Sequence, residues 1–290
     1  KARGLNADKF LRNFSWFFSN GMDPEYGVIG RVSRRIWAIA MRDLYGVGDR
    51  GQKLKYHIQG SGRSLHSQEF TWNDYRTTLQ ALYALADNAN SLHTNSRDEA
   101  FGTPTEDTVR DAVAIQLILS KEYGWLQNEN PLQGSFFAEW LTDSVEERVL
   151  RIFEEMHARG GVLGSLEVNY QRNRIQDESM VYEQRKHSGE LPIVGVNTYI
   201  DEGSAVMSSD DFDVDVTRSD ESERHMVIDR NMAFKKAHSA EAEAGLARLK
   251  QVAREGGNLF EVMMDIVDHC TVGQVTQALF ETGGKFRRNM

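Results

Sequence analysis

Two short segments carry the side chains best suited to chemistry. Residues 56–62 read YHIQGSG, in which His57 and Gln59 precede two closely spaced glycines. Residues 91–99 read SLHTNSRDE and bring a second histidine, an asparagine and two acids. Side chains two positions apart on a strand point to the same face, so His57 and Gln59 can address one ligand together. The pattern indicates a ligand that needs an imidazole, an amide and a glycine gap at the end of one strand.

Several kinds of site agree with parts of this pattern. His57, His66 and His93 could bind zinc at the strand ends of a hydrolase barrel, although no compact metal-ligand spacing supports this. Each histidine could equally be a hydrogen-bonded core residue. A serine hydrolase would need a G-x-S-x-G motif, which is absent, and Cys270 lies in an apparent packing helix. No G-x-x-x-x-G-K-[ST] phosphate loop occurs in the 290 residues.

The elements that must position these residues alternate between strand and helix. Alternation with short connections favours an α/β fold with a parallel sheet, either doubly wound or a barrel. Polar residues cluster at 57–62, at 93–99 and at Asn197, where strands end, and ligands bind at that rim in a (β/α) barrel. We therefore predict a barrel. The expected strands are SWFFSN, LKYHIQ, ANSLHTN and LPIVGVNTY, and the expected helices lie near 24–46, 73–88, 103–124, 142–161 and 171–187.

Capping signals predict where three of the helices begin. Asn73 is expected to cap the helix that follows it. Thr103, Pro104 and Glu106 read as a capping box with proline at the first helical position. Ser144 with Glu147 reads as a second capping box.

Composition excludes several classes of protein. The chain is 40% hydrophobic and 27% charged, with a net charge of −9, which argues against a nucleic-acid-binding surface. Its single cysteine, Cys270, excludes an internal disulfide and fits a reducing cytoplasm. No apolar run approaches the length of a membrane span. The sequence begins without methionine, so we expect it to be part of a longer polypeptide.

The chain divides into three stretches by composition. Residues 1–200 carry the alternating elements, but only about half of the strands of a barrel. Residues 201–238 are acidic, poor in apolar residues and expected to form a mobile surface connection. Residues 239–290 predict a small unit of three helices for packing or an interface. A half-barrel leaves open strand edges, so the first stretch should need another segment to complete it.

The two opening segments resemble a known family. HIQGSGRSL and NSLHTNSRDEA are similar to the H-x-Q-T-S-G-x-S-L and S-L-H-T-N-x-x-D-E-A motifs of the coenzyme B12-dependent acyl-CoA mutases, the methylmalonyl-CoA mutase family. The likeness covers nearly the whole chain except 201–238. It is strongest to the C-terminal part of fused members, which join a B12-binding domain, a G-protein chaperone domain and a mutase barrel. The resemblance implies the C-terminal half of a (β/α)8 TIM barrel followed by a small helical unit.

The resemblance also implies an activity and its partners. A family member is a radical isomerase that uses adenosylcobalamin to move the thioester group of an acyl-CoA to the neighbouring carbon. Isobutyryl-CoA and n-butyryl-CoA are the expected pair, with methylmalonyl-CoA or another branched acyl-CoA as alternatives. Expected partners are the B12-binding domain, the G domain with GTP and Mg, the N-terminal half of the barrel and a second copy in a homodimer. A metal-dependent hydrolase or a non-catalytic assembly subunit remains as an alternative of another class.

Individual roles follow from the matched positions. Gly60 stands where the family has threonine, which removes a hydroxyl from the motif. The resemblance implies that Ser15, Arg50 and Lys55 contact the acyl-CoA. It implies that Glu167 and Asn289 contact the nucleotide on the G domain, and it predicts no metal ligand in this chain. Cofactor contacts are expected from Phe17, His57, Gln59, Gly62, Asn95, Glu99 and Gly102.

Overall fold

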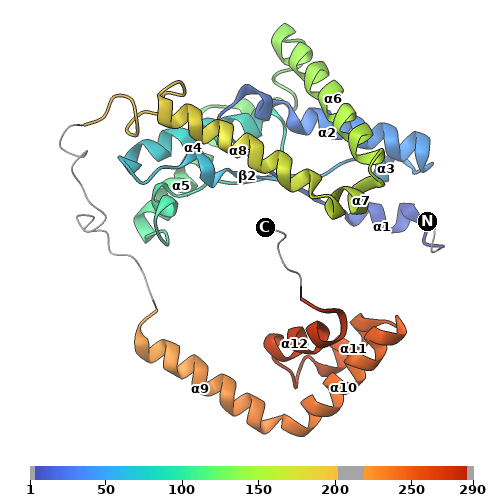
Figure 1. Cartoon of the computed structure of the whole chain (residues 1–290). Helices are drawn as coiled ribbons and strands as arrows, with labels where there is room; N and C mark the ends of the chain where they lie inside the picture. The colour runs from blue at the N-terminus through green and yellow to red at the C-terminus, as the bar shows by residue number, and fades with distance from the viewer. Residues whose placement is uncertain (1–3, 202–218, 286–290) are drawn as a thin grey trace. The chain divides into compact units, whose positions relative to one another are not determined.

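The computed structural model describes residues 4–201 and 219–285 (Figure 1). The chain forms two compact units, Lys1–Thr217 and Arg218–Met290. Asn289 lies outside the described residues, as do residues 202–218 of the acidic segment. Within the described ranges, no helix is long and apolar enough to cross a membrane.

A three-stranded parallel sheet lies at the centre of the first unit. Its strands are β1 (Trp16–Asn20), β2 (Tyr56–Gly60) and β3 (Ser91–His93), side by side in the order β1-β2-β3. These are three of the four strands that the sequence predicts. Tyr56 and Ile58 are buried on one face of β2, where they pack with Ala84 of the following helix. Burial of these side chains stabilises the packing of the sheet against this helix, because burying an aliphatic or aromatic side chain contributes about 1.5–3 kcal/mol to the free energy of folding.

Helices make up most of the rest of the first unit, so the fold is a largely helical α/β arrangement with a small parallel sheet. The expected helix from Pro24 to Gly46 is present in three parts: a 3-10 turn over Pro24–Gly27, helix α2 and a π turn over Ala40–Leu44. The helices of this unit are α1 (Ala7–Phe10), α2 (Ile29–Ile39), α3 (Asp49–Gln52), α4 (Asn73–Ala86), α5 (Glu106–Leu117), α6 (Phe136–His157), α7 (Gly161–Glu167) and α8 (Tyr170–Ser188).

The segment LPIVGVNTY is not a strand, so that prediction is wrong. It forms a turn with a single isolated bridge between Val194 and Thr198. Gly195 has φ +75°, a left-handed conformation that interrupts an extended strand. Asn197 closes the turn, because its Nδ2 donates to the Lys186 carbonyl at 2.8 Å and its Oδ1 accepts from the Ile193 N–H at 2.7 Å. Asn197 is therefore a turn residue and not part of a strand-end rim.

The three predicted helix starts are also wrong. The N-cap of α5 is Thr105, which pairs with Thr108 in the capping box, two residues after the expected Thr103. Helix α6 begins after Ser135, so Ser144 lies inside it. Asn73 occupies the first helical position of α4 and is fully buried; its side chain bonds the backbone of His66 instead of capping the helix. Thr105 and Ser135 cap α5 and α6 with their own side chains, whereas the N-cap position of α4 is Trp72, which makes no side-chain capping bond.

The second unit contains only helices in its described part. Its first helix, α9, covers much of the segment expected to be a mobile connection. The other three enclose a small core around Leu249, Val262 and Ile266, as the sequence predicts for 239–290. Gly245 permits the close approach, because a Cβ there would lie 2.6 Å from Ile266 Cγ2. The helices are α9 (Glu221–Ala237), α10 (Ser239–Glu255), α11 (Leu259–Ile266) and α12 (Val272–Gly283).

Candidate functional site

One face of the sheet carries polar and aromatic side chains that are not buried. Residues 17, 57 and 91 pair across the three strands, and residues 19, 59 and 93 form the next row on the same face. The six side chains are Phe17, His57, Ser91, Ser19, Gln59 and His93, each exposed or half-buried. Parallel sheets are usually covered on both faces, so an open polar face indicates that something else lies against it.

The first row of this face is tied together by direct contacts. The His57 ring stacks on the Phe17 ring with centroids 5.4 Å apart, and its Nδ1 lies 2.8 Å from Ser91 Oγ. Phe17 is 60% exposed, so its ring offers a broad apolar surface beside the imidazole. The structure thus places Phe17 on the same face as His57 and Gln59, and all three residues are predicted to contact the cofactor.

The glycine gap lies just beyond the end of β2. Gly62 opens a short 3-10 turn, and a Cβ there would meet no atom within 4 Å. The backbone at Gly62 is therefore accessible to a flat ligand. Arg63, the next residue, places its guanidinium 4.0 Å from the centre of the Tyr182 ring of α8. Helix α8, labelled in Figure 1, therefore lies beside this turn through the contact between Arg63 and Tyr182.

The segment after β3 holds the remaining predicted cofactor residues. Glu99 is part of a capping box, in which its Oε1 accepts from the Ser96 N–H at 3.1 Å. The same oxygen lies 3.9 Å from His93 Nε2 on the polar face. Gly102 follows that turn, and its N–H donates to the Asp98 carbonyl. Asn95, in contrast, is buried and donates from Nδ2 to the Gly60 carbonyl at 2.8 Å.

A basic hollow of about 820 Å³ lies at the opposite, amino-terminal ends of the strands. It contains Arg50 and Lys55, the two cations predicted for the acyl-CoA, whereas Ser15 is exposed immediately before β1. Asp49 is the single acid among its lining residues. Phosphates bind well in such a place, because several cations share one concavity. The cations of the hollow are Arg12, Arg34, Arg50, Lys53 and Lys55.

A buried carboxylate supports the wall of this hollow. Asp87 has no exposed surface and accepts from the N–H groups of Gly30 at 2.5 Å and Arg31 at 2.9 Å, at the start of α2. Arg34 donates to the Asp87 carbonyl and to Tyr56 Oη. Burial raises the pKa of Asp87 to about 7, although the two backbone donors and Arg34 act in the opposite direction. Burial likewise raises the pKa of Tyr56.

The histidines do not form a metal site. Burial lowers the pKa of His66 to about 4, so this imidazole stays neutral, and His57 and His93 contact Ser91 and Glu99 as described above. Among the described residues, no three His, Cys, Asp or Glu side chains gather closely enough to hold a metal ion. The zinc-hydrolase alternative therefore has no ligand set in the part of the chain that the structure describes.

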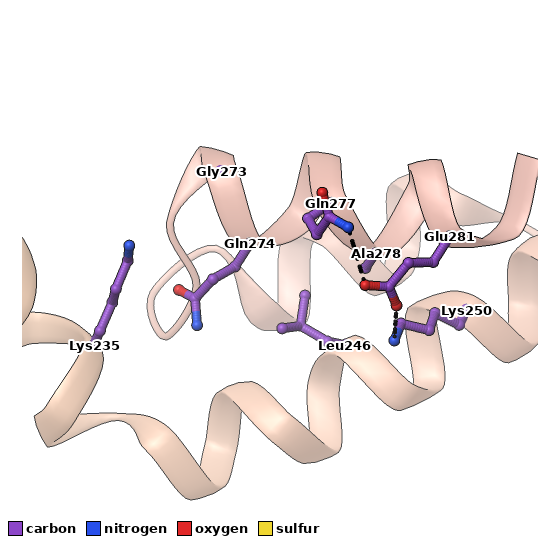
Figure 2. A pocket seen from close by; sticks show the side chains of 8 residues that line it. All are labelled: Lys235, Leu246, Lys250, Gly273, Gln274, Gln277, Ala278 and Glu281. Atoms are coloured by element: carbon purple, nitrogen blue, oxygen red, sulfur yellow. Dashed lines mark hydrogen bonds and ion pairs between the residues drawn. The ribbon is translucent and has the colours of Figure 1, made fainter. Parts of the chain in front are cut away.

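The second unit has a hollow of its own, of about 430 Å³, between α10 and α12 (Figure 2). The Glu281 carboxylate in this hollow accepts hydrogen bonds from Lys250 Nζ at 2.5 Å and from Gln277 Nε2 at 3.1 Å. None of the residues predicted for a ligand lines it. Glu167 is exposed at the end of α7 in the first unit and is not among the lining residues of either hollow.

Comparison with known proteins agrees with this geometry. The methylmalonyl-CoA mutase family model matches residues 1–285. The chain belongs to this family. It is 57% identical over 289 residues to the fused isobutyryl-CoA mutase of Nocardia farcinica, covering 100% of this chain and 27% of that protein. It is 31% identical over 289 residues to the 2-hydroxyisobutanoyl-CoA mutase large subunit of Aquincola tertiaricarbonis, covering 98% of this chain and 50% of that protein.

A mouse mitochondrial methylmalonyl-CoA mutase is also similar, with 32% identity over 291 residues that cover 99% of this chain and 38% of that protein. Of the fused isobutyryl-CoA mutases that it matches, the chain spans about a quarter of the length. Membership of the methylmalonyl-CoA mutase family, predicted from the two motifs, is confirmed.

The strand ends of this mutase chain fit a corrinoid cofactor. The half-buried Gln59 and the open backbone at Gly62 present polar and flat surfaces side by side. Glu99 keeps part of its side chain exposed beside His93, the residue that pairs with Gln59 across the sheet, and a carboxylate there can accept from hydroxyl groups.

Sequence reasoning missed several residues of this mutase chain. Arg12, Arg34 and Lys53 line the basic hollow, and Ser19 and Ser91 complete the polar face. The alternation along each strand could have found the serines, because positions two apart share a face. Lys53 lies between Arg50 and Lys55 in the sequence and could have been found by its position, whereas only the fold brings Arg12 and Arg34 to the same hollow.

Proposed function

We propose that this chain is part of an adenosylcobalamin-dependent mutase that interconverts isobutyryl-CoA and n-butyryl-CoA. The observation that carries the proposal is the placement of the two family motifs at the carboxyl ends of neighbouring parallel strands. Ligands bind at that end of parallel sheets in barrels. The 57% identity to fused isobutyryl-CoA mutases supports the choice of substrate.

The sheet is proposed to be the C-terminal half of a (β/α)8 barrel. β1 and β3 are the edges of the sheet, and neither has a second partner among the described residues. Open edges of this kind pair readily with further strands. The open polar face would then point into the barrel, and residues 239–290 would form a helical unit after it. The remaining strands and the B12-binding domain would come from the rest of the polypeptide or from a partner chain.

The chain's own residues divide the work between the two ends of the sheet. Arg50 and Lys55 would bind the phosphates of CoA, and Ser15 would contact the substrate nearby. At the other end, Phe17, His57 and Gln59 would form a wall against the cofactor, with Gly62 and Gly102 leaving room for it. Asn95 would shape that wall by holding Gly60, and Glu99 would accept from the hydroxyls of the adenosyl group.

Adenosylcobalamin supplies, when bound, the radical chemistry by which a hydrogen atom leaves the acyl group and later returns. The protein orients the reacting parts and keeps water and other reactants away, which is the usual division of labour with such cofactors. We also propose that Glu167, with Asn289, reaches the nucleotide of an associated G domain that holds GTP and Mg, and that the assembled enzyme is a cytoplasmic homodimer.

A product assay tests the proposed function. The complete polypeptide that contains this chain is incubated with adenosylcobalamin and, in separate reactions, with isobutyryl-CoA, methylmalonyl-CoA and 2-hydroxyisobutanoyl-CoA. We expect n-butyryl-CoA to be the fastest-formed product, detected by mass spectrometry. Faster turnover of another acyl-CoA would reassign the substrate. Binding of cofactor and acyl-CoA without any product would favour a non-catalytic assembly subunit.

A further inference from the structure

Three buried carboxamides lie behind the strand ends, on the helix-facing side of the sheet. Asn20 ends β1, Gln80 lies in α4, and Asn95 follows β3; they are 0%, 1% and 1% exposed. Burying a primary amide costs free energy unless its donors and acceptors are paired. Three such groups so close to the candidate site therefore call for a reason.

Gln80 joins the ends of β1 and β2. Its Nε2 donates to the Asn20 carbonyl at 3.1 Å and lies 3.5 Å from the Ser61 carbonyl. In return, Asn20 Nδ2 donates to the Gln80 carbonyl at 2.8 Å, and the Ser61 N–H donates to the Asn20 carbonyl at 2.7 Å. Asn95 adds the link to Gly60. One helix residue thus fixes two neighbouring strands at the point where they turn into the loop that carries Gly62.

The side-chain oxygens of the same three residues are unpaired. Asn20 Oδ1, Gln80 Oε1 and Asn95 Oδ1 have no hydrogen-bond partner among the described residues. The oxygen of Gln80 faces Gly60, because a Cβ on Gly60 would lie 3.1 Å from it. A buried acceptor without a donor is costly, so core packing alone does not account for a glutamine here.

We propose that Gln80 is a positioning residue of the strand-end site: it holds the ends of β1 and β2 so that Gln59 and Gly62 face the cofactor, and its Oε1 is free to accept from a hydroxyl introduced at position 60. This inference rests on the proposed function for the identity of the ligand. The linkage between the strand ends is independent of that identity.

Gln80→Leu tests the positioning role in the complete enzyme, with Gln116→Leu as the matched control. Gln116 is a half-buried glutamine of α5 whose Nε2 bonds the Leu92 carbonyl of β3 and Oγ1 of Thr94, just after that strand, and not the ends of β1 and β2. We expect Gln80→Leu to weaken adenosylcobalamin binding about tenfold and to raise the fraction of cofactor oxidised per turnover. The KM for acyl-CoA should not change, because the basic hollow is untouched. Equal effects of the two variants on cofactor binding and oxidation would overturn the proposal.

Hydrogen exchange separates this inference from the proposed function. Exchange of the Ser61 amide should accelerate about tenfold in Gln80→Leu and stay at the wild-type rate in Gln116→Leu, whether or not cofactor is present. If the wild type binds no adenosylcobalamin, the proposed function fails while this result can still stand. If the Ser61 amide exchanges at one rate in all three proteins, the positioning role is wrong.

A pair of isosteric variants tests the free oxygen. Gly60→Thr brings a hydroxyl that can donate to Gln80 Oε1 after a shift of a few tenths of an ångström, whereas Gly60→Val has the same shape and no donor. We expect the threonine variant to keep cofactor affinity within about threefold of the wild type and the valine variant to lose about tenfold. Equal behaviour of the two variants would show that Gln80 Oε1 accepts nothing at this position.

Discussion

Lys55 immediately precedes β2 and Gln59 lies near its carboxyl end, four positions further along the chain. At about 3.3 Å per residue this separation is about 13 Å. Lys55 lines the basic hollow, and Gln59 belongs to the polar face beside the glycine gap. We propose that an extended acyl-CoA lies along this face, with its phosphates at the Lys55 end and its acyl group at the Gln59 end.

Removing a cation from the hollow should weaken acyl-CoA binding and leave the chemical step intact. In the complete enzyme, we expect Arg50→Ala and Lys55→Ala each to raise the KM about tenfold, equivalent to about 1.4 kcal/mol, with kcat nearly unchanged. Because salt screens exposed charges, the effect should shrink as ionic strength rises. Steady-state kinetics at several salt concentrations measure it, and the exposed Lys121→Ala serves as the control. A KM that stays at the wild-type value at every salt concentration would return both residues to ordinary surface charges.

Glu99 should act at the other end of the strand. A carboxylate that accepts from hydroxyl groups contributes about 1.5–3 kcal/mol, so Glu99→Ala should slow rearrangement roughly ten- to a hundredfold. The KM for acyl-CoA should stay the same, and more cofactor should end oxidised. Glu99→Gln, which keeps an acceptor oxygen, should fall between. Turnover and cofactor absorbance measure both effects.

The capping box provides the control for Glu99. Ser96→Ala removes the other half of the box and leaves the carboxylate in place. If the role of Glu99 is only to cap the turn at Arg97–Ala100, both variants should melt earlier and turn over alike. A Glu99→Ala enzyme that melts early, yet turns over at the wild-type rate without extra oxidation of the cofactor, would rule out the ligand role.

The raised pKa of Asp87 predicts a pH dependence of stability. The carboxyl ionises near pH 7 in the folded state and near its ordinary value of 3.8 in the unfolded state. The unfolded state therefore loses its proton first, and stability should fall as the pH rises from about 4 to about 7, by up to about 1.4 kcal/mol per pH unit. Asp87→Asn should lack this slope. Urea unfolding between pH 4 and 8 gives the comparison, and parallel curves for the two proteins would contradict the assignment.

The core of the second unit should depend on Leu249. This side chain is fully buried among α10, α11 and α12, so Leu249→Ala should lower the free energy of unfolding of that unit by about 2–5 kcal/mol. Met264→Ala on the exposed side of α11 should change it by less than about 0.5 kcal/mol. Denaturant unfolding followed by circular dichroism measures both changes. Similar losses for the two variants would show that Leu249 is not at the centre of this core.

Local patterns predicted the strands well and the helix starts poorly. The alternation Tyr56, His57, Ile58, Gln59 is explicit in the sequence, and the structure confirms the expected face of each residue. Helix caps were harder to predict, because several polar residues lie near Ser135 and near Thr105 in the sequence. Which of them becomes the N-cap depends on packing. The strand predicted around Gly195 is a turn instead, because the Asn197 side chain donates to the Lys186 carbonyl. No local sequence pattern reveals that contact.

The candidate site shows the same division. The motifs point to His57, Gln59 and Glu99 because each residue lies within a short, distinctive segment, 56–62 for the first two and 91–99 for Glu99. Gln80 bonds Asn20, which lies 60 positions away in the chain, and Arg34 of the hollow bonds Asp87, which lies 53 positions away, so only the folded structure places them.

The absorption spectrum of bound adenosylcobalamin tests the central claim most directly. The complete enzyme is loaded with the cofactor without oxygen, and isobutyryl-CoA is added. We predict a rapid change in the corrin spectrum in the wild type, the same change in Lys55→Ala at saturating substrate, and a much smaller change in Glu99→Ala. A wild-type enzyme that binds both ligands and shows no spectral change with isobutyryl-CoA or any other acyl-CoA would contradict the account.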